Sequence, residues 1–152
     1  MKILHLNYFD NIGGAGIAVK RLHNEFLDKG FDSKIIVFNS NNVDKNVISI
    51  NTRFSKIFDL IFIRIESIIL KIYKPYIGAF SLNLFGTLSI NKIKNQKPDI
   101  IYIHWINNSF ISINLLKKIL KLNIPTFIFL HDMWFLTGGC HHSFDCTKYL
   151  DH

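Results

Sequence analysis

Two histidines stand at the ends of predicted strands, where a parallel sheet presents its ligand-binding edge. His104 follows the apolar residues 100–103, and His131 follows the apolar run 125–130 with Asp132 next to it. In open α/β sheets ligands bind outside the carboxyl ends of the strands, so we expect both imidazoles at the functional edge. Asp132 can line the same crevice as His131 only if the chain turns there, because successive side chains of a strand face opposite ways. The alternative is that both histidines are hydrogen-bonded structural residues.

A glycine-rich segment indicates a second kind of chemistry, anion binding. Gly13, Gly14, Ala15 and Gly16 form a predicted loop between a strand and a helix. Backbone N–H groups and the helix dipole favour a phosphate or carboxylate at such a place. The alternative is a tight turn without a ligand. The dinucleotide fingerprint is incomplete because Val19 takes the place of its third glycine, and no Walker motif follows, so dehydrogenase, kinase and NTPase functions are disfavoured.

Thiols and imidazoles near the end of the sequence have the chemistry of zinc ligands. Cys140, His141 and Cys146 lie in one short segment, but structural zinc sites use closer cysteine pairs and a second ligand pair. Three alternatives stay open: a metal site, a disulfide or redox pair, and unlinked thiols in a surface loop. A Ser-His-Asp triad is not assigned, because the sequence has no G-x-S-x-G elbow or other positioned nucleophile.

Strands and helices alternate along the chain, which predicts a doubly wound, Rossmann-like α/β domain with a parallel sheet. The late strands are near-continuous apolar runs, a pattern typical of parallel strands covered on both faces. Polar residues over 40–46 predict a loop. The predicted elements are strand 3–9, helix 17–29, strand 34–39, short strand 47–50, helix 54–76, strand 99–105, helix 113–122 and strand 125–131.

The segment 54–76 is dense in apolar residues at helical spacing. Five charges interrupt it, and they would be costly at bilayer depth, so a transmembrane span is rejected. We expect the apolar face to pack on the sheet or on a neighbouring helix. The alternative is that the face rests on an anionic membrane surface, flanked by cations. The apolar face comprises Phe54, Ile57, Phe58, Ile61, Ile65, Ile68, Ile69 and Ile72, and the cations are Lys56, Arg64, Lys71 and Lys74.

Composition and charge favour one globular domain that does not bind nucleic acid. The 152 residues are 49% hydrophobic, enough for a packed core. A formal charge of +7 comes from 18 Lys and Arg against 11 Asp and Glu, but the lysines are spread along the chain instead of clustered with aromatics. The first residues are too short and polar a run for a secretory signal, which predicts a cytoplasmic protein.

Three sequence blocks together resemble retaining bacterial glycosyltransferases of family 4. They are GGAGIA at 13–18, followed by RLH at 21–23, then DIIYIHW at 99–105, and LHDMWFLTGGCH at 130–141. The similarity covers most of the chain and is specific at 1–38 and 99–146. It is greatest to members that serve capsule, colanic-acid-type or other surface-polysaccharide pathways.

The resemblance implies a GT-B fold, in which two Rossmann-like domains face each other across a cleft. The first domain mainly binds the acceptor and the second mainly binds the nucleotide sugar. Residues 1–152 would then form an incomplete N-terminal, acceptor-side domain without the donor-binding domain, and we expect them to be inactive alone. The implied reaction transfers a sugar, with retention, from a nucleotide-diphosphate sugar to a glycan or lipid-linked acceptor. The alternative is a non-catalytic glycan- or partner-binding remnant, or one subunit of a split enzyme whose donor domain is a separate polypeptide.

The same resemblance implies roles for individual residues. His131 matches the family histidine that contacts the donor sugar near the reacting carbon, where it would position the sugar and stabilise charge. The glycine-rich segment 13–16 would lie beside the donor diphosphate or the acceptor. His104 and Asp132 are further substrate-binding candidates, because of their place at the strand ends. These enzymes generally need no metal or other cofactor, so the cluster 140–146 remains a weak metal candidate. A site of action at the inner face of the membrane is compatible with the amphipathic helix.

Overall fold

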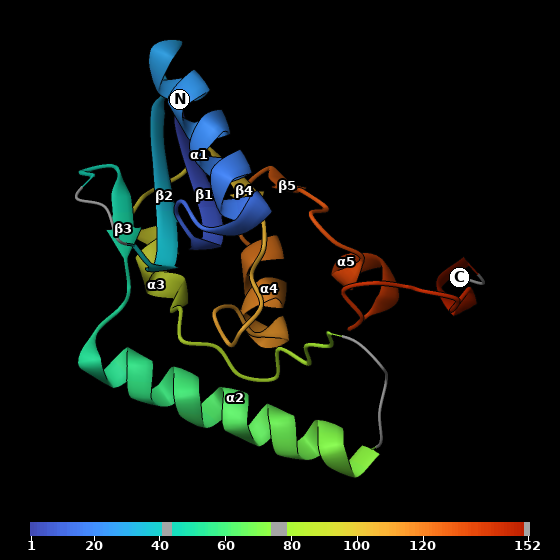
Figure 1. The fold of residues 1–152 in the computed structure, drawn as a ribbon. Coiled ribbons are helices and arrows are strands. Elements are labelled where there is room, and N and C mark those ends of the chain that lie inside the picture. Colours follow the sequence, from blue (N-terminus) through green and yellow to red (C-terminus); the bar gives the residue numbers. More distant parts are fainter. Residues whose placement is uncertain (41–43, 74–78, 151–152) are drawn as a thin grey trace.

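A computed structural model describes residues 1–40, 44–73 and 79–150 as strands, helices and connecting loops (Figure 1). The bounds of the elements follow in chain order. They are β1 (Lys2–Phe9), α1 (Gly13–Asp28), β2 (Asp32–Asn39), β3 (Val47–Ser49), α2 (Arg53–Tyr73), α3 (Ile90–Lys94), β4 (Ile100–Ile103), α4 (Ile113–Leu120), β5 (Thr126–Ile128), α5 (Trp134–Thr137) and the 3-10 helix η1 (Lys148–Leu150).

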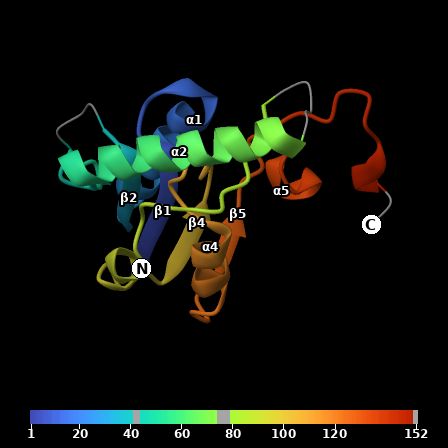
Figure 2. The same cartoon turned by 90° about the horizontal axis from the view of Figure 1, so that it is seen from below.

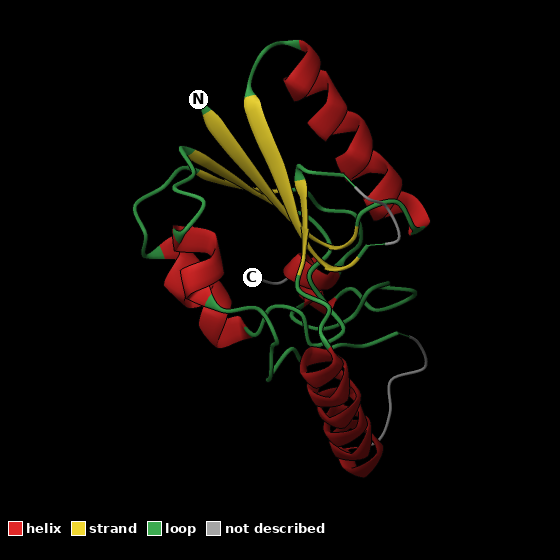
Figure 3. Ribbon diagram, turned by 90° about the vertical axis from the view of Figure 1, so that its left-hand side faces the viewer, coloured by secondary structure: helices red, strands yellow, loops and turns green. Residues whose placement is uncertain are grey.

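The five strands form one parallel sheet in the order β3-β2-β1-β4-β5. β1 lies at its centre, where Leu4 pairs with Lys34 of β2 and with Ile101 of β4. Helix α1 covers one face, and α3 and α4 lie on the other (Figure 3). The predicted α/β class with a parallel, Rossmann-like sheet is therefore confirmed.

Side chains that alternate along the strands build two layers of core. On one face Leu6 and Ile103 belong to a cluster with Ile119 of α4, and all three are fully buried. On the other face Ile35 packs with Val19 of α1. Successive residues of a strand point to opposite faces, so a run of apolar residues in β1 and β2 fills both layers.

Strand β5 departs from the expectation that it is covered on both faces. It comprises only Thr126–Ile128, and Phe127 and Phe129 are 50% and 39% exposed. β5 lies at one edge of the sheet, so its side chains have strand neighbours on one side only. The apolar run correctly predicted a strand, but its predicted length and burial were wrong.

Helix α2 lies across the carboxyl ends of the strands, away from the sheet faces (Figures 1 and 2). The expectation that its apolar face packs on the sheet or a helix is wrong, because most of that face is exposed. No helix in the described ranges combines the length and apolar character needed to cross a membrane. The predicted end of the helix at Tyr76, the cation Lys74 and loop residues 41–43 lie outside the described residues. The exposed apolar residues of α2 are Phe54, Ile57, Phe58, Leu60, Ile61, Ile63, Ile65, Ile68 and Ile72.

Candidate functional site

A cavity of about 580 Å³ lies at the carboxyl edge of the sheet. Its walls come from the end of β1, the start of α1, the segment 79–81, and the loops that follow β4 and β5. Parallel sheets bind ligands at this edge, so the cavity is the default candidate for a functional site. Its lining residues are Asn7, Phe9, Ile12, Gly13, Gly14, Ala15, Gly16, Ala79, Phe80, Ser81, Trp105, Asn108, His131, Asp132, His141 and His142.

The glycine-rich segment lies inside the first turn of α1, and not in a loop as expected. The helix begins at Gly13, and the N-cap residue Ile12 gives its backbone no side-chain hydrogen bond. No acidic residue stands in the first turn. The first N–H groups of a helix have no partner within the helix, and together with its dipole they attract anions. The cavity therefore has one wall suited to a phosphate or carboxylate.

Two glycines of this turn differ in how much space surrounds them. A Cβ on Gly16 would lie 3.3 Å from the backbone C and N of Asn11, whereas a Cβ on Gly14 would meet nothing within 4 Å. Alanine raises helix propensity equally at both positions, so that gain cancels in a comparison. We expect Gly16→Ala to be less stable than Gly14→Ala by about 1–3 kcal/mol in urea unfolding, because the loop before α1 must shift. Equal unfolding midpoints would show that the close approach of Asn11 does not matter.

Three histidines form a hydrogen-bonded chain from the core to the cavity. His5 Nδ1 lies 3.1 Å from His104 Nε2, and His104 Nδ1 lies 3.0 Å from His131 Nε2. His104 follows β4 as predicted, but it is buried behind His131 and does not line the cavity. Burial lowers the pKa of His5 and of His104 to about 3. Desolvation also lowers the pKa of His131, against the opposing effect of Asp132. The three rings are therefore neutral at pH 7.

The surroundings of His5, at the buried end of this row of histidines, determine which nitrogen of each ring carries the proton. His5 Nε2 is buried and has no hydrogen-bond partner among the described residues. A buried N–H without an acceptor is rarer than an acceptor without a donor, so the proton of His5 is assigned to Nδ1. His5 then donates to His104, and His104 donates to His131. His131 accepts at Nε2 and carries its own proton on Nδ1, which makes it a hydrogen-bond donor.

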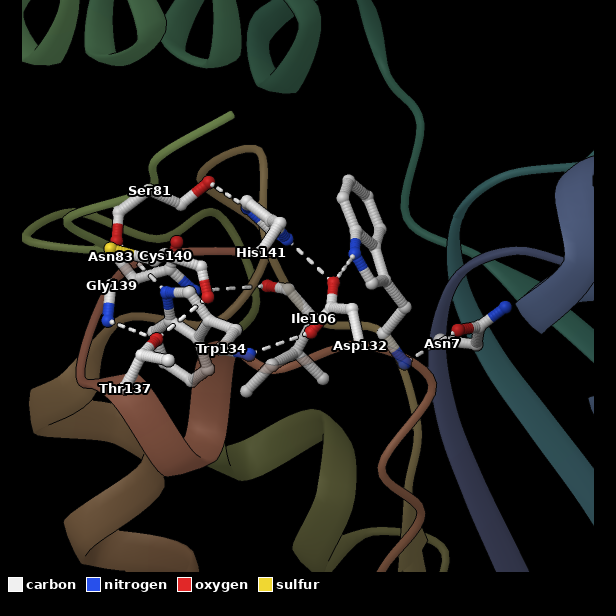
Figure 4. Close-up of polar contacts among 11 residues, drawn as sticks. Asn7, Ser81, Asn83, Ile106, Asp132, Trp134, Thr137, Gly139, Cys140 and His141 are labelled. Carbon is white, nitrogen blue, oxygen red and sulfur yellow. Dashed lines mark hydrogen bonds and ion pairs between the residues drawn. The ribbon is translucent and has the colours of Figure 1, made fainter. Parts of the chain in front are cut away.

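Asp132, the residue after His131, is the centre of a second network (Figure 4). Its Oδ2 accepts hydrogen bonds from Trp105 Nε1 at 2.8 Å and from His141 Nδ1 at 2.5 Å. Its Oδ1 accepts from the backbone N–H of Trp134 at 2.9 Å. The chain bends at residues 131–133 before α5 begins, so His131 and Asp132 both line the cavity.

The cluster 140–146 contributes an imidazole to this network. Both nitrogens of His141 are engaged, Nδ1 with Asp132 and Nε2 with Ser81 Oγ at 2.8 Å. Cys140 and Cys146 are free thiols, and Cys146 is exposed. Within the described part of the chain, no three His, Cys, Asp or Glu side chains are grouped so that they could hold a metal ion.

Several residues of the site were not singled out from the sequence. Ser81 reaches the site because the neighbouring Phe80 forms an antiparallel bridge with Cys140. No local sequence pattern predicts a pairing between such distant segments. Asn7 accepts a hydrogen bond from the backbone N–H of Trp105 at 2.9 Å. A buried asparagine at the end of an apolar strand was a usable signal. The structure also aligns Ser81, His141 and Asp132, although the sequence around Ser81 has no nucleophile motif.

Together the fold and the site define a Rossmann-like α/β protein with an anion-suited, histidine-bearing cavity at the carboxyl edge of its sheet. No protein-family model, curated protein or solved structure matches the chain.

Proposed function

We propose that the chain is the acceptor-side domain of a retaining GT-B glycosyltransferase of family 4, active in surface-polysaccharide biosynthesis in the cytoplasm. It would act with a donor-binding domain to transfer a sugar from a nucleotide-diphosphate sugar to a glycan or lipid-linked acceptor. The observation that carries the proposal is that one cavity is lined both by the uncapped start of α1 and by His131. An anion site and a neutral hydrogen-bond donor are what a sugar with a diphosphate leaving group requires.

The start of α1 suits the phosphate part of such a reaction. Negative charge grows on the diphosphate as the bond to the sugar breaks. Preorganised N–H groups and the positive end of a helix dipole stabilise developing charge without reorganising, which is the main source of electrostatic catalysis. A Cβ at Gly13 or at Gly14 would meet no other atom within 4 Å, so a ligand can approach the backbone there. The proposal requires no metal and no other cofactor.

His131 suits the sugar part. Its Nε2 is occupied by His104, so Nδ1 is the atom left to bind a hydroxyl or phosphate oxygen. The lowered pKa of His131 keeps its ring neutral. A neutral ring can position a ligand by hydrogen bonding, but it does not form an ion pair with it. Asp132 holds the indole of Trp105 against the same cavity. An apolar wall with a few fixed polar groups is the usual composition of a small-molecule site.

Titration of the chain combined with a donor-binding domain by nucleotide-diphosphate sugars tests this assignment, with tryptophan fluorescence as the readout because Trp105 lines the cavity. We expect His131→Ala to weaken binding by about 10-fold or more, since one hydrogen bond to a charged or polar ligand group is lost. The matched control is Leu130→Ala, which removes an exposed neighbour that does not line the cavity. Equal affinities for the two variants would contradict the role of His131.

Hydrolysis is a second candidate function, favoured by the line from Asp132 through His141 to Ser81. A nucleophile within hydrogen-bond reach of a base, with the base oriented by a third group, is the signature of an activated serine. Ser81 Oγ would attack an ester carbonyl, His141 Nε2 would take its proton, and the alcohol would leave with that proton. Water, deprotonated by the same imidazole, would then attack the acyl group on Ser81 and release the acid and the free serine hydroxyl. Covalent labelling of Ser81 by a fluorophosphonate probe would favour hydrolysis, whereas sugar transfer predicts no labelling.

A further inference from the structure

Helix α2 turns its acidic side chains towards the protein and most of its apolar side chains towards solvent. Asp59 is 6% exposed, and its Oδ2 accepts a hydrogen bond from the hydroxyl of Tyr8 at 3.1 Å. Glu66 is 7% exposed, and its Oε1 accepts from the backbone N–H of Leu84 at 2.9 Å. The two carboxylates therefore fix the helix on the protein and orient it about its own axis.

The outward face of α2 is a continuous apolar surface. Seven large apolar side chains on this face are between 36% and 76% exposed, from Phe54 to Ile72, and Leu60 and Ile63 are exposed on a neighbouring side of the helix. Single exposed apolar residues are ordinary, but a contiguous patch along one element marks an interaction surface. With 21 residues the helix is about 30 Å long, so the patch extends over a large part of the protein's width.

The charges at the edge of this patch have one sign. Arg53, Lys56, Arg64 and Lys71 are all exposed, whereas both acidic residues of α2 are buried. The helical repeat places Arg53, Arg64 and Lys71 along one margin of the apolar face. A solvent-facing surface that is apolar at its centre and basic at its margin complements the acyl chains and anionic headgroups of a lipid surface.

We propose that α2 is a membrane-docking helix that lies in the plane of an anionic lipid surface. Its apolar face would enter the boundary between headgroups and acyl chains, and its cations would bind lipid phosphates. A protein partner is less well matched, because the cores of protein interfaces are depleted of lysine, whereas Lys56 and Lys71 are exposed on this helix and Lys71 lies at the margin of the apolar face. Since α2 lies across the carboxyl ends of the strands, docking would hold the cavity edge of the sheet near the lipid (Figure 2). Membrane binding does not require sugar transfer.

Sedimentation with lipid vesicles tests this docking through charge. The vesicles are phosphatidylcholine with roughly 30% phosphatidylglycerol, and pure phosphatidylcholine is the neutral reference. We expect the wild-type chain to bind the anionic vesicles, and the triple variant Lys56→Glu/Arg64→Glu/Lys71→Glu to bind about 100-fold more weakly. The matched control, Lys117→Glu/Lys118→Glu/Lys121→Glu, makes the same change of net charge at exposed positions in and beside α4 and should lose less than about threefold.

A second pair of variants tests the apolar face. Ile61→Gln/Ile68→Gln should lower vesicle binding by about 10-fold or more, while Ile113→Gln/Leu120→Gln on α4 should leave it unchanged. All four side chains are exposed, so circular dichroism should show folded variants.

Three results would overturn the proposal: no binding of the wild type to anionic vesicles, equal losses in the α2 and α4 charge variants, or a lipid-free dimer that the α2 variants abolish. The last would show that a second copy of the chain covers the face. Vesicle binding is measured without nucleotide sugar, so its outcome is separate from that of the sugar titration.

Discussion

Lowering the pH from 7 to 5 is expected to reduce the free energy of unfolding by about 4 kcal/mol. His5 and His104 are buried, and burial lowers the pKa of each from 6.5 to about 3. Between these two pH values the unfolded chain binds protons that the folded chain does not bind. The stability is therefore complete above pH 6.5 and is lost as the pH falls towards 3. His23 and His131, whose pKa values are also lowered, act in the same direction.

Urea unfolding at pH 7, 6 and 5 measures this loss. His104→Gln removes one of the two groups, so the difference between pH 7 and pH 5 should shrink by about 2 kcal/mol, although the variant is less stable at every pH. His142→Gln serves as the matched control, because it makes the same substitution at an exposed histidine. A wild-type difference below about 1 kcal/mol would mean that the histidine chain accepts protons without unfolding.

Asp132→Ala should lower the free energy of unfolding by about 4 kcal/mol, because three donors lose a charged acceptor at once. The donors are Trp105 Nε1, His141 Nδ1 and the backbone N–H of Trp134. Each of them would be left partly buried and unpaired, which costs more than the loss of the bond itself. The indole of Trp105 and the ring of His141 should also move, which would deform the cavity.

Urea unfolding and near-ultraviolet circular dichroism of the tryptophans report the two effects of Asp132→Ala. Asp132→Asn keeps one oxygen as an acceptor and should be affected about half as much. Asp145→Ala removes an exposed carboxylate further along the same segment and should change stability by less than about 0.5 kcal/mol. If Asp132→Ala and Asp145→Ala unfold at the same urea concentration, Asp132 does not hold the site together.

Elements with a strong local signal could be predicted from the sequence. The apolar runs identify β1, β2 and β4, and the alternation with helical patterns predicts the parallel sheet. His104 and His131 were correctly placed at the carboxyl edge, because the ends of parallel strands meet there. The sequence does not predict which of the two histidines lines the cavity and which one is buried behind it. His104 lies behind His131 because the two side chains bond to each other across adjacent loops.

The sequence-based predictions were wrong where a structural feature depends on contacts between distant segments instead of on the local sequence pattern. Periodicity along 54–76 predicts an apolar face, but it does not predict whether another surface covers that face. In α2 the buried side chains include the acidic residues Asp59 and Glu66. Gly13 has the left-handed φ of 71° that the glycines led us to expect, but the helix already begins at this residue, without a capping side chain. Ser81 and His141 meet through a pairing of distant segments, which carries no local signature.

Sugar transfer itself is the most direct test of the central claim. The wild-type chain and His131→Ala are each combined with a donor-binding domain and incubated with labelled nucleotide-diphosphate sugars and lipid-linked glycans, and the products are analysed by mass spectrometry. The proposed function predicts a product enlarged by one sugar with retained configuration, formed at least about 100-fold more slowly by His131→Ala. Equal rates for the two proteins, or no enlarged product with any donor, would contradict it.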